Sequence, residues 1–411
     1  MRRARGPAMG PFMSVQRLPS AWILLATALV ACDPSPATST GAASVASSAA
    51  PVAITPPADP DRPDTCAPCH SAVVEEWKES MHARAHHLLD PIYAGVRNAR
   101  AKKEGEEVTK GCAGCHTPRD LVDAESAKAK LGVSCASCHQ VAHVDEKARG
   151  VAAFTATEGN LMLGPHDVAE DKSPAHATGA APAHMKDGVR LCNACHGELA
   201  TPGGVTMCAT GIEHGEAAKG EGARTCVDCH MQEEQGPSGS AVARTTHKSH
   251  RFAGPHRAWY QQDPKLLEGA VDMSAELSPG KVTVTLKNLS QHAFPTGFPG
   301  RVAEVVVEGQ VGGKVTFRSA GKVDEAKLTK IYVDAEGKPT LAPWAEKIAS
   351  DTRLKAGETR SIDITVPADL EEATVKLLFR LLPPPLADKL GVANKTEGRF
   401  QVVATKVLKK S

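Results

Sequence analysis

"CAPCHSAVVEEWKESMHARAHH", residues 66–87, holds two cysteines and four histidines and opens on a C-x-x-C-H motif. The same motif occurs at four further places, and together the five motifs take up ten of the twelve cysteines. Histidine makes up only 17 of 411 residues. Five unrelated C-x-x-C pairs would all be followed by histidine with odds on the order of one in ten million. The motifs are Cys66/Cys69/His70, Cys112/Cys115/His116, Cys135/Cys138/His139, Cys192/Cys195/His196 and Cys226/Cys229/His230.

C-x-x-C-H is the attachment signature of haem c. Its two thiols form thioethers with the porphyrin, and the adjacent imidazole binds the iron. Structural zinc sites use C-x-x-C pairs two at a time and do not require the following histidine. A disulfide inside C-x-x-C closes too small a loop to stabilise a fold well, and thioredoxin-type motifs come singly. The sequence therefore predicts five covalently bound haem c groups, with these five histidines as proximal iron ligands.

A low-spin haem also needs a second axial ligand, and twelve histidines remain. Apolar residues recur at helical spacing in residues 71–85, which predicts a helix there. The twelve residues from His70 to His82 would rise about 18 Å along a helix. The two rings would then be too far apart to share one iron, so we expect His82 to bind a different haem from the one attached at Cys66 and Cys69.

Other histidines follow the third and fifth motifs. His176 and His250 are the favoured distal ligands among them. The weaker candidates for any remaining position are His143, His166, His87 and His247.

The phrases around the motifs are also informative. They are WKESMHARA after the first motif, TCVDCHM at 225–231, SHRFAGPH at 249–256 and QHAFPTG at 291–297. Over roughly residues 62–300 the chain resembles multihaem cytochromes related to the cytochrome c-554 family, which are exported electron-transfer proteins with closely stacked haems. The resemblance implies that His82, His176 and His250 are distal ligands, and it adds His292. The chain has five motifs instead of the prototype's four, and an added C-terminal region, so the haem-to-ligand pairing cannot be transferred.

The N-terminus predicts export. Residues 1–31 combine four arginines, no acidic residue and a short apolar run, as in a cleaved signal peptide. The run ends in Leu-Val-Ala-Cys, which resembles the bacterial lipobox, so we expect Cys32 to be lipidated; an ordinary signal peptide with an incidental cysteine is the alternative. Residues 32–63 are rich in Ser, Ala, Thr and Pro and predict a disordered tether. We therefore expect a bacterial lipoprotein on the periplasmic side of the inner membrane, or at the outer membrane or cell surface.

The chain changes character near residue 269. Runs of alternating apolar and polar residues follow, separated by Gly, Pro, Asn and Asp, which predicts an antiparallel β-sandwich. The expected strands are 281–288, 303–311, 314–319, 360–366, 373–381 and 398–407. The predicted fold class is thus α + β in separate domains: a mostly helical and loop pentahaem domain over 64–268, built around stacked haems, and a β-sandwich domain over 269–411.

These features favour an electron carrier anchored to a membrane. Its expected partners are donor and acceptor cytochromes or a membrane quinol-linked complex. A net charge of +1 and the lack of a basic domain argue against nucleic-acid binding. The alternative is a reductase of a small nitrogen or sulfur species that uses one haem with an open axial position. Cys208 stands outside the motifs; a small buried apolar residue is favoured there over a functional thiol.

Overall fold

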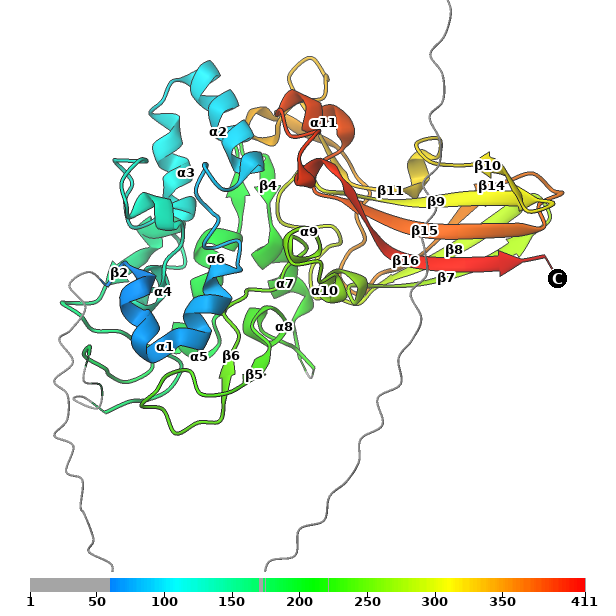
Figure 1. The fold of residues 1–411 in the computed structure, drawn as a ribbon. Coiled ribbons are helices and arrows are strands. Elements are labelled where there is room, and N and C mark those ends of the chain that lie inside the picture. Colours follow the sequence, from blue (N-terminus) through cyan, green and yellow to red (C-terminus); the bar gives the residue numbers. More distant parts are fainter. Residues whose placement is uncertain (1–59, 170–172, 174, 221, 411) are drawn as a thin grey trace, which may run out of the picture. The chain divides into compact units, whose positions relative to one another are not determined.

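Short helices joined by loops make up the chain to about residue 268, and β-strands dominate after it (Figure 1). The structure is a computed structural model, and it describes residues 60–169, 173, 175–220 and 222–410. All of these residues belong to one compact unit. The predicted signal peptide, Cys32 and the tether up to residue 59 lie outside the described residues. Within the described ranges, none of the helices is both long enough and apolar enough to cross a bilayer.

Each C-x-x-C-H motif lies within a helix or forms one. Residues i, i+3 and i+4 share one face of a helix, so a helical turn presents both thiols and the imidazole on the same side. α1 contains the first motif and has a kink at His70, α3 and α6 end on the second and fourth motifs, and α4 and α8 consist of the third and fifth. These helices are α1 (Pro63–Lys78), α3 (Val108–His116), α4 (Cys135–His139), α6 (Val189–His196) and α8 (Cys226–His230).

The helix expected over 71–85 is shorter than predicted. α1 ends at Lys78, and the chain turns at Ser80, whose hydroxyl donates to the carbonyl oxygen of Trp77 and accepts from the amide of Ala83. This local hydrogen bonding competes with helix continuation. His82 therefore lies in a turn beyond the helix, and not on its surface.

The other elements of the first part are short. They are the helices α2 (Pro91–Glu104), α5 (Ala183–Lys186), α7 (Thr210–Ala217), α9 (Arg257–Tyr260) and α10 (Lys265–Glu268), and the strands β1 (Val141–Val144), β2 (Phe154–Ala156), β3 (Leu199–Ala200), β4 (Thr206–Cys208), β5 (Glu233–Gln235) and β6 (Thr246–Lys248). The strands form three small antiparallel pairs, β1 with β2, β3 with β4, and β5 with β6. Little regular structure therefore supports this part of the chain.

The second part contains two larger antiparallel sheets. One has the order β14-β8-β7, and the other β10-β9-β15-β16 with β11 also paired to β9. The strands are β7 (Val271–Ser278), β8 (Lys281–Asn288), β9 (Val302–Val311), β10 (Lys314–Arg318), β11 (Lys327–Leu328), β14 (Thr359–Thr365), β15 (Glu372–Arg380) and β16 (Phe400–Lys409). All six strands expected from the sequence are present. The hairpin of β12 (Lys330–Val333) and β13 (Lys347–Asp351), and strand β7, were not predicted.

Both sheets contribute to one apolar cluster, because alternate residues of their strands point to the same side. Leu286 of β8, Ile364 of β14 and Leu377 of β15 are completely buried in it. The cluster extends to Ile92 of α2 and Trp259 of α9. The β part and the helical part therefore share a core.

A second contact joins the two parts. A Cβ at Gly95 of α2 would lie 2.9 Å from the Cβ of Leu390, just after α11 (Pro384–Lys389), so glycine permits the close approach.

Candidate haem-binding site

All ten motif cysteines line a single cavity of about 3480 Å³. Pockets for one drug-sized ligand usually measure about 300–1,000 Å³, so this cavity has room for several large groups. The proximal histidines His70, His116, His139, His196 and His230 line it as well. Its volume and its thiol and imidazole lining fit several haem c groups.

Four of the five proximal imidazoles have Nδ1 engaged by the backbone, which leaves Nε2 free. Backbone carbonyl oxygens lie within hydrogen-bond distance of Nδ1 of His70, His116, His139 and His230, namely those of Ser238, Ala85, Leu163 and Ala253. Such a contact fixes the tautomer and the ring orientation and leaves Nε2 for a metal. Burial also lowers the pKa of His116 and His139, which keeps these rings neutral.

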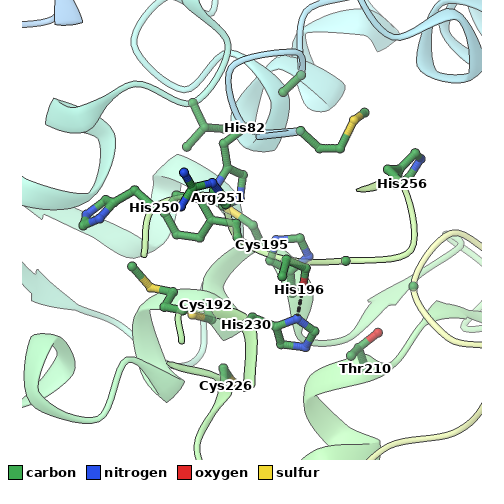
Figure 2. A pocket seen from close by; sticks show the side chains of 18 of the residues that line it. His82, Cys192, Cys195, His196, Thr210, Cys226, His230, His250, Arg251 and His256 are labelled. Carbon is green, nitrogen blue, oxygen red and sulfur yellow. Dashed lines mark hydrogen bonds between the residues drawn. The ribbon is translucent and has the colours of Figure 1, made fainter. Parts of the chain in front are cut away.

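Four proximal rings each face a second histidine ring across the cavity. The pairs are His70–His176, His82–His196, His139–His250 and His230–His292, with ring centres 6.4, 6.1, 6.1 and 6.3 Å apart. The structure thus brings together four of the predicted distal ligands with four proximal ones. Figure 2 shows the rings of His82 and His196 among the side chains that line the cavity, together with His250 and His230.

The spacing matches the one that a shared metal requires. Two imidazoles that each bond a metal at about 2.0–2.1 Å, with the ring centre roughly 1.1 Å behind the nitrogen, have their centres roughly 6.3 Å apart. Direct stacking of two rings would give a shorter separation, as between Tyr93 and His116 at 3.7 Å. A metal ion held between the two rings of each pair would therefore lie at an ordinary bonding distance from both imidazoles.

The fold positions His82 through a close backbone contact. The amide of Val133 donates to the carbonyl oxygen of His82 at 2.9 Å, and the indole of Trp77 donates to the carbonyl oxygen of Val133 at 2.8 Å. Gly132 has a φ of +65°, and a Cβ there would lie 2.4 Å from the carbonyl oxygen of His82. Glycine is therefore needed for the turn to pack here.

The His82–His196 pair differs from the other three. Neither ring makes a side-chain hydrogen bond to a described residue, and the two ring planes are tilted by 41°. In the other pairs the distal rings of His176, His250 and His292 place Nδ1 near a local carbonyl oxygen. Burial is the main reason that the pKa falls to about 3 for His82 and about 4 for His196, so both rings are neutral.

One short segment contacts three of the motif sites. His250 faces His139, and the carbonyl oxygen of Ala253 contacts Nδ1 of His230. Between them, Phe252 packs edge-on against both His82 and His250, with ring centres 4.2 and 5.7 Å apart. Phe252 has a φ of +45°, which is rare for a bulky residue and requires support from its surroundings.

Glu76 holds this segment against α1. Its carboxylate accepts hydrogen bonds from the amide of His250 at 2.8 Å and from Arg251 at 2.9 Å, and lies 3.2 Å from Nε2 of His247. Glu76 is only 4% exposed. A buried carboxylate with several donors is strongly tied to its position. Sequence reasoning missed both Glu76 and Phe252, because nothing in the local pattern distinguishes them from ordinary helix-surface and loop residues.

The second motif lacks a facing imidazole. All 17 histidines lie in the described residues, yet none has a ring opposite His116. The ring of Tyr93 stacks on His116 with an angle of 10°. His143, predicted as a ligand, lies in β1, does not line the cavity, and faces none of the proximal rings.

The weaker candidates have other contacts or no proximal partner. His87 contacts Glu125, and His247 contacts Glu76. His166 lines the cavity without facing a proximal ring. Cys208 ends β4 and also lines the cavity, where burial raises the pKa of its thiol and keeps it protonated.

The motif sites lie next to one another. Three pairs of thiols from different motifs lie close enough to shift each other's pKa: Cys66 with Cys135, Cys115 with Cys195, and Cys192 with Cys226. These mutual influences link the first motif to the third, and the fourth to the second and the fifth. Electrostatic influence of Cys138 on Cys192 and Cys195 connects the third motif with the fourth. The five sites therefore form one connected network.

Comparison with known proteins agrees with this geometry. Residues 65–140 match the family described as "Cytochrome c554 and c-prime". Over 82 residues the chain is 35% identical to cytochrome c-554 of Nitrosomonas europaea, an alignment that covers 18% of this chain and 35% of that protein. The structure superposes on the penta-haem cytochrome c552 of Thermochromatium tepidum with a TM-score of 0.67 and 24% identity, over 84% of this chain and 97% of the other.

These matches, together with five C-x-x-C-H motifs that line one cavity, support a multihaem c-type cytochrome. The matched segment of cytochrome c-554 is about a third of that protein's length. The family match over residues 65–140 covers the first three motifs of this chain. The likeness to the penta-haem protein concerns the fold and extends through most of this cytochrome, including much of its β part.

Proposed function

We propose that this cytochrome carries electrons between redox partners through five haem c groups, four of them with two histidine ligands. The observation that carries the proposal is the set of four facing histidine pairs at 6.1–6.4 Å. Haem c supplies reversible one-electron chemistry when bound. The chain's own contribution is to hold both imidazoles of each pair neutral and oriented, and to exclude water by burial.

The connected arrangement of sites supports transfer through the protein. No site is isolated, since a thiol of each motif influences the pKa of a thiol in at least one other motif. We further propose that the haems stack closely and that the two sheets pack as a sandwich, which lends His292 to the fifth motif. The partners proposed are other redox proteins, either cytochromes or a quinol-linked membrane complex.

Two measurements on the purified holoprotein test the main proposal. Mass spectrometry of the denatured chain counts the covalent haems, and a redox titration followed by absorbance and electron paramagnetic resonance (EPR) counts low-spin centres. We expect five haems and four low-spin centres with two histidines each. A pyridine haemochrome assay without haem c would refute the proposal.

A second candidate function is reduction of a small nitrogen or sulfur compound at the second motif. It is favoured by one observation: none of the described histidines faces His116. An iron held there by one imidazole would have an open position. We expect a high-spin EPR signal that cyanide or nitric oxide converts; a fifth low-spin centre that is unresponsive to both would exclude this function.

We also propose that Cys32 carries a lipid that anchors the protein to a membrane from the exported side. The support is the lipobox-like sequence before Cys32. In the native bacterial host, the protein should be found in the membrane fraction, and Cys32→Ser should release it into the soluble exported fraction. A wild-type protein that is soluble without detergent would contradict the anchor.

A further inference from the structure

Arg301 is a cation that lines the haem cavity without an anionic partner. It lies in the loop between β8 and β9, the same loop that carries His292. Its Nη1 donates to the carbonyl oxygen of Thr296 at 2.6 Å. Its Nε is buried and finds no acceptor among the described residues. One edge of the guanidinium is thus fixed, and the Nε–H is left without a partner.

The loop is shaped around this side chain. Gly297 has a φ of +83°, and a Cβ at this position would lie 2.6 Å from Nη1 of Arg301. The positive φ favours glycine at this position. The loop backbone therefore passes close to the guanidinium of Arg301.

The missing partner is unusual for a buried charge in this protein. Arg353, which lies in the same part of the chain, pairs with Asp351 at 2.8 Å and with Glu213 at 2.9 Å. No described carboxylate lies within ion-pair distance of Arg301. Burial lowers the pKa of Arg301 to about 10, which still leaves it charged at neutral pH. A charge removed from water without a counter-ion is strongly destabilising.

Two further donors lie near Arg301. His256 lines the cavity and makes no side-chain hydrogen bond to a described residue, and both Arg301 and Arg84 exert a positive field on it. Arg84 lies over the ring of Tyr260 at 4.2 Å, and its Nε also lacks an acceptor. Figure 2 shows His256 beside the cavity, away from the facing pairs.

The acidic groups of this region are already engaged. Asp90 accepts the amides of Ile92 and Tyr93 as the N-cap of α2. Glu397 accepts the hydroxyl of Tyr260. Neither carboxylate forms an ion pair with Arg301 or Arg84, although the charge of Asp90 stabilises the charged form of Arg301 from a distance.

We propose that Arg301 and His256 form an anion-binding site inside the cavity that takes a carboxylate or a small inorganic oxyanion, with the positive charge of Arg84 nearby. A guanidinium fork matches the paired oxygens of such groups. The anion has two possible sources: a propionate of a haem bound in the cavity, or a free oxyanion such as nitrite, sulfite or phosphate. The inference rests on the haem loading proposed above.

The test uses the full holoprotein with Arg301→Gln, Arg301→Lys and, as a matched control, Arg318→Gln. The side chain of Arg318 in β10 is 66% exposed, so Arg318→Gln removes the same charge from the protein surface instead of from the cavity. Haem content is first counted by mass spectrometry. Each variant is then titrated electrochemically in buffer free of oxyanions, and its spectrum is titrated with nitrite, sulfite and phosphate.

If the anion is a propionate, Arg301→Gln lowers the midpoint potential of one haem, since loss of a nearby cation favours the ferric state. Arg301→Lys lowers it less, and Arg318→Gln leaves it unchanged. If the anion is free, the wild-type spectrum responds to an oxyanion saturably, and Arg301→Gln weakens the apparent affinity at least tenfold. Either result supports the site and identifies the source.

The inference is overturned if Arg301→Gln keeps five haems and matches the Arg318→Gln control in both titrations. If Arg301→Gln loses haem, a crystal structure of the wild-type holoprotein decides whether Arg301 binds an anion. An oxyanion or propionate oxygen within hydrogen-bond distance of the guanidinium supports the site, and a guanidinium that meets only water or backbone overturns it. A haem count other than five in the wild type would instead overturn the proposed function.

Discussion

Replacing His82 with alanine tests the pairing of ligands across the cavity. The substitution removes one of two rings whose centres lie 6.1 Å apart and leaves His196 alone at the fourth motif. One of four facing pairs is lost, so low-spin ferric iron should fall by about a quarter, from four centres to three. Spin-quantified EPR of the oxidised holoprotein measures this change. Haem content should stay at five, because no thioether is altered.

Added imidazole provides a rescue in the same sample. The deleted ring leaves a cavity next to Phe252, and free imidazole should enter it and restore the fourth low-spin signal. His87→Ala is the matched control, since His87 lies five residues away, contacts Glu125 and does not line the cavity. It should leave the low-spin count unchanged.

A comparison with His176→Ala shows which haem His82 binds. His176 faces His70, so its loss should remove the low-spin component of the haem at Cys66 and Cys69. His82→Ala should remove a different component. If both variants remove the same component, or if His82→Ala changes only the haem at the first motif, the pairing derived from the ring distances is wrong.

Three further substitutions test other parts of the structure. Phe252→Leu removes the ring that packs against both His82 and His250, so the EPR g values of two low-spin haems should shift while all five haems are retained. A shift in one haem only, or in none, would contradict this role. Glu76→Ala leaves Arg251 and His247 without their buried carboxylate, so it should lower the free energy of unfolding by denaturant by about 3–5 kcal/mol. Glu76→Gln should recover part of this loss. A loss under about 1 kcal/mol would show that the contacts are not needed. Leu377→Ala in the fully buried core of β15 should cost about 2–5 kcal/mol while the haem spectra stay unchanged, and a spectral change at the fifth motif would mean that the sheet core controls His292 directly.

The sequence allowed the main features of the candidate site to be predicted because haem attachment is a local pattern. Two thiols and an imidazole at i, i+3 and i+4 need only one helical turn to share a face. The β-strands were predicted for a similar reason, since alternation along KVTVTLKN directly reflects one buried and one exposed face. The end of α1 was not predicted, because a single serine side chain decided it through hydrogen bonds that the apolar spacing does not reveal.

The distal ligands show what the local sequence pattern cannot predict. The sequence marked His82, His176, His250 and His292 as candidates, and these are the four whose rings face proximal histidines. It also marked His143 as a weaker candidate, and this residue lies in β1 away from the cavity. Which histidine faces which depends on segments far apart in the chain, and no spacing rule relates them.

The sequence alone therefore determined the chemistry of attachment and the change from helices to strands. Only the tertiary structure decided the partners of each imidazole, the lack of a facing imidazole at His116, and the unpaired charge of Arg301. The physical reason is that covalent attachment and strand alternation depend on neighbours in sequence, whereas ring facing, burial and counter-charges depend on distances between residues that only folding brings together.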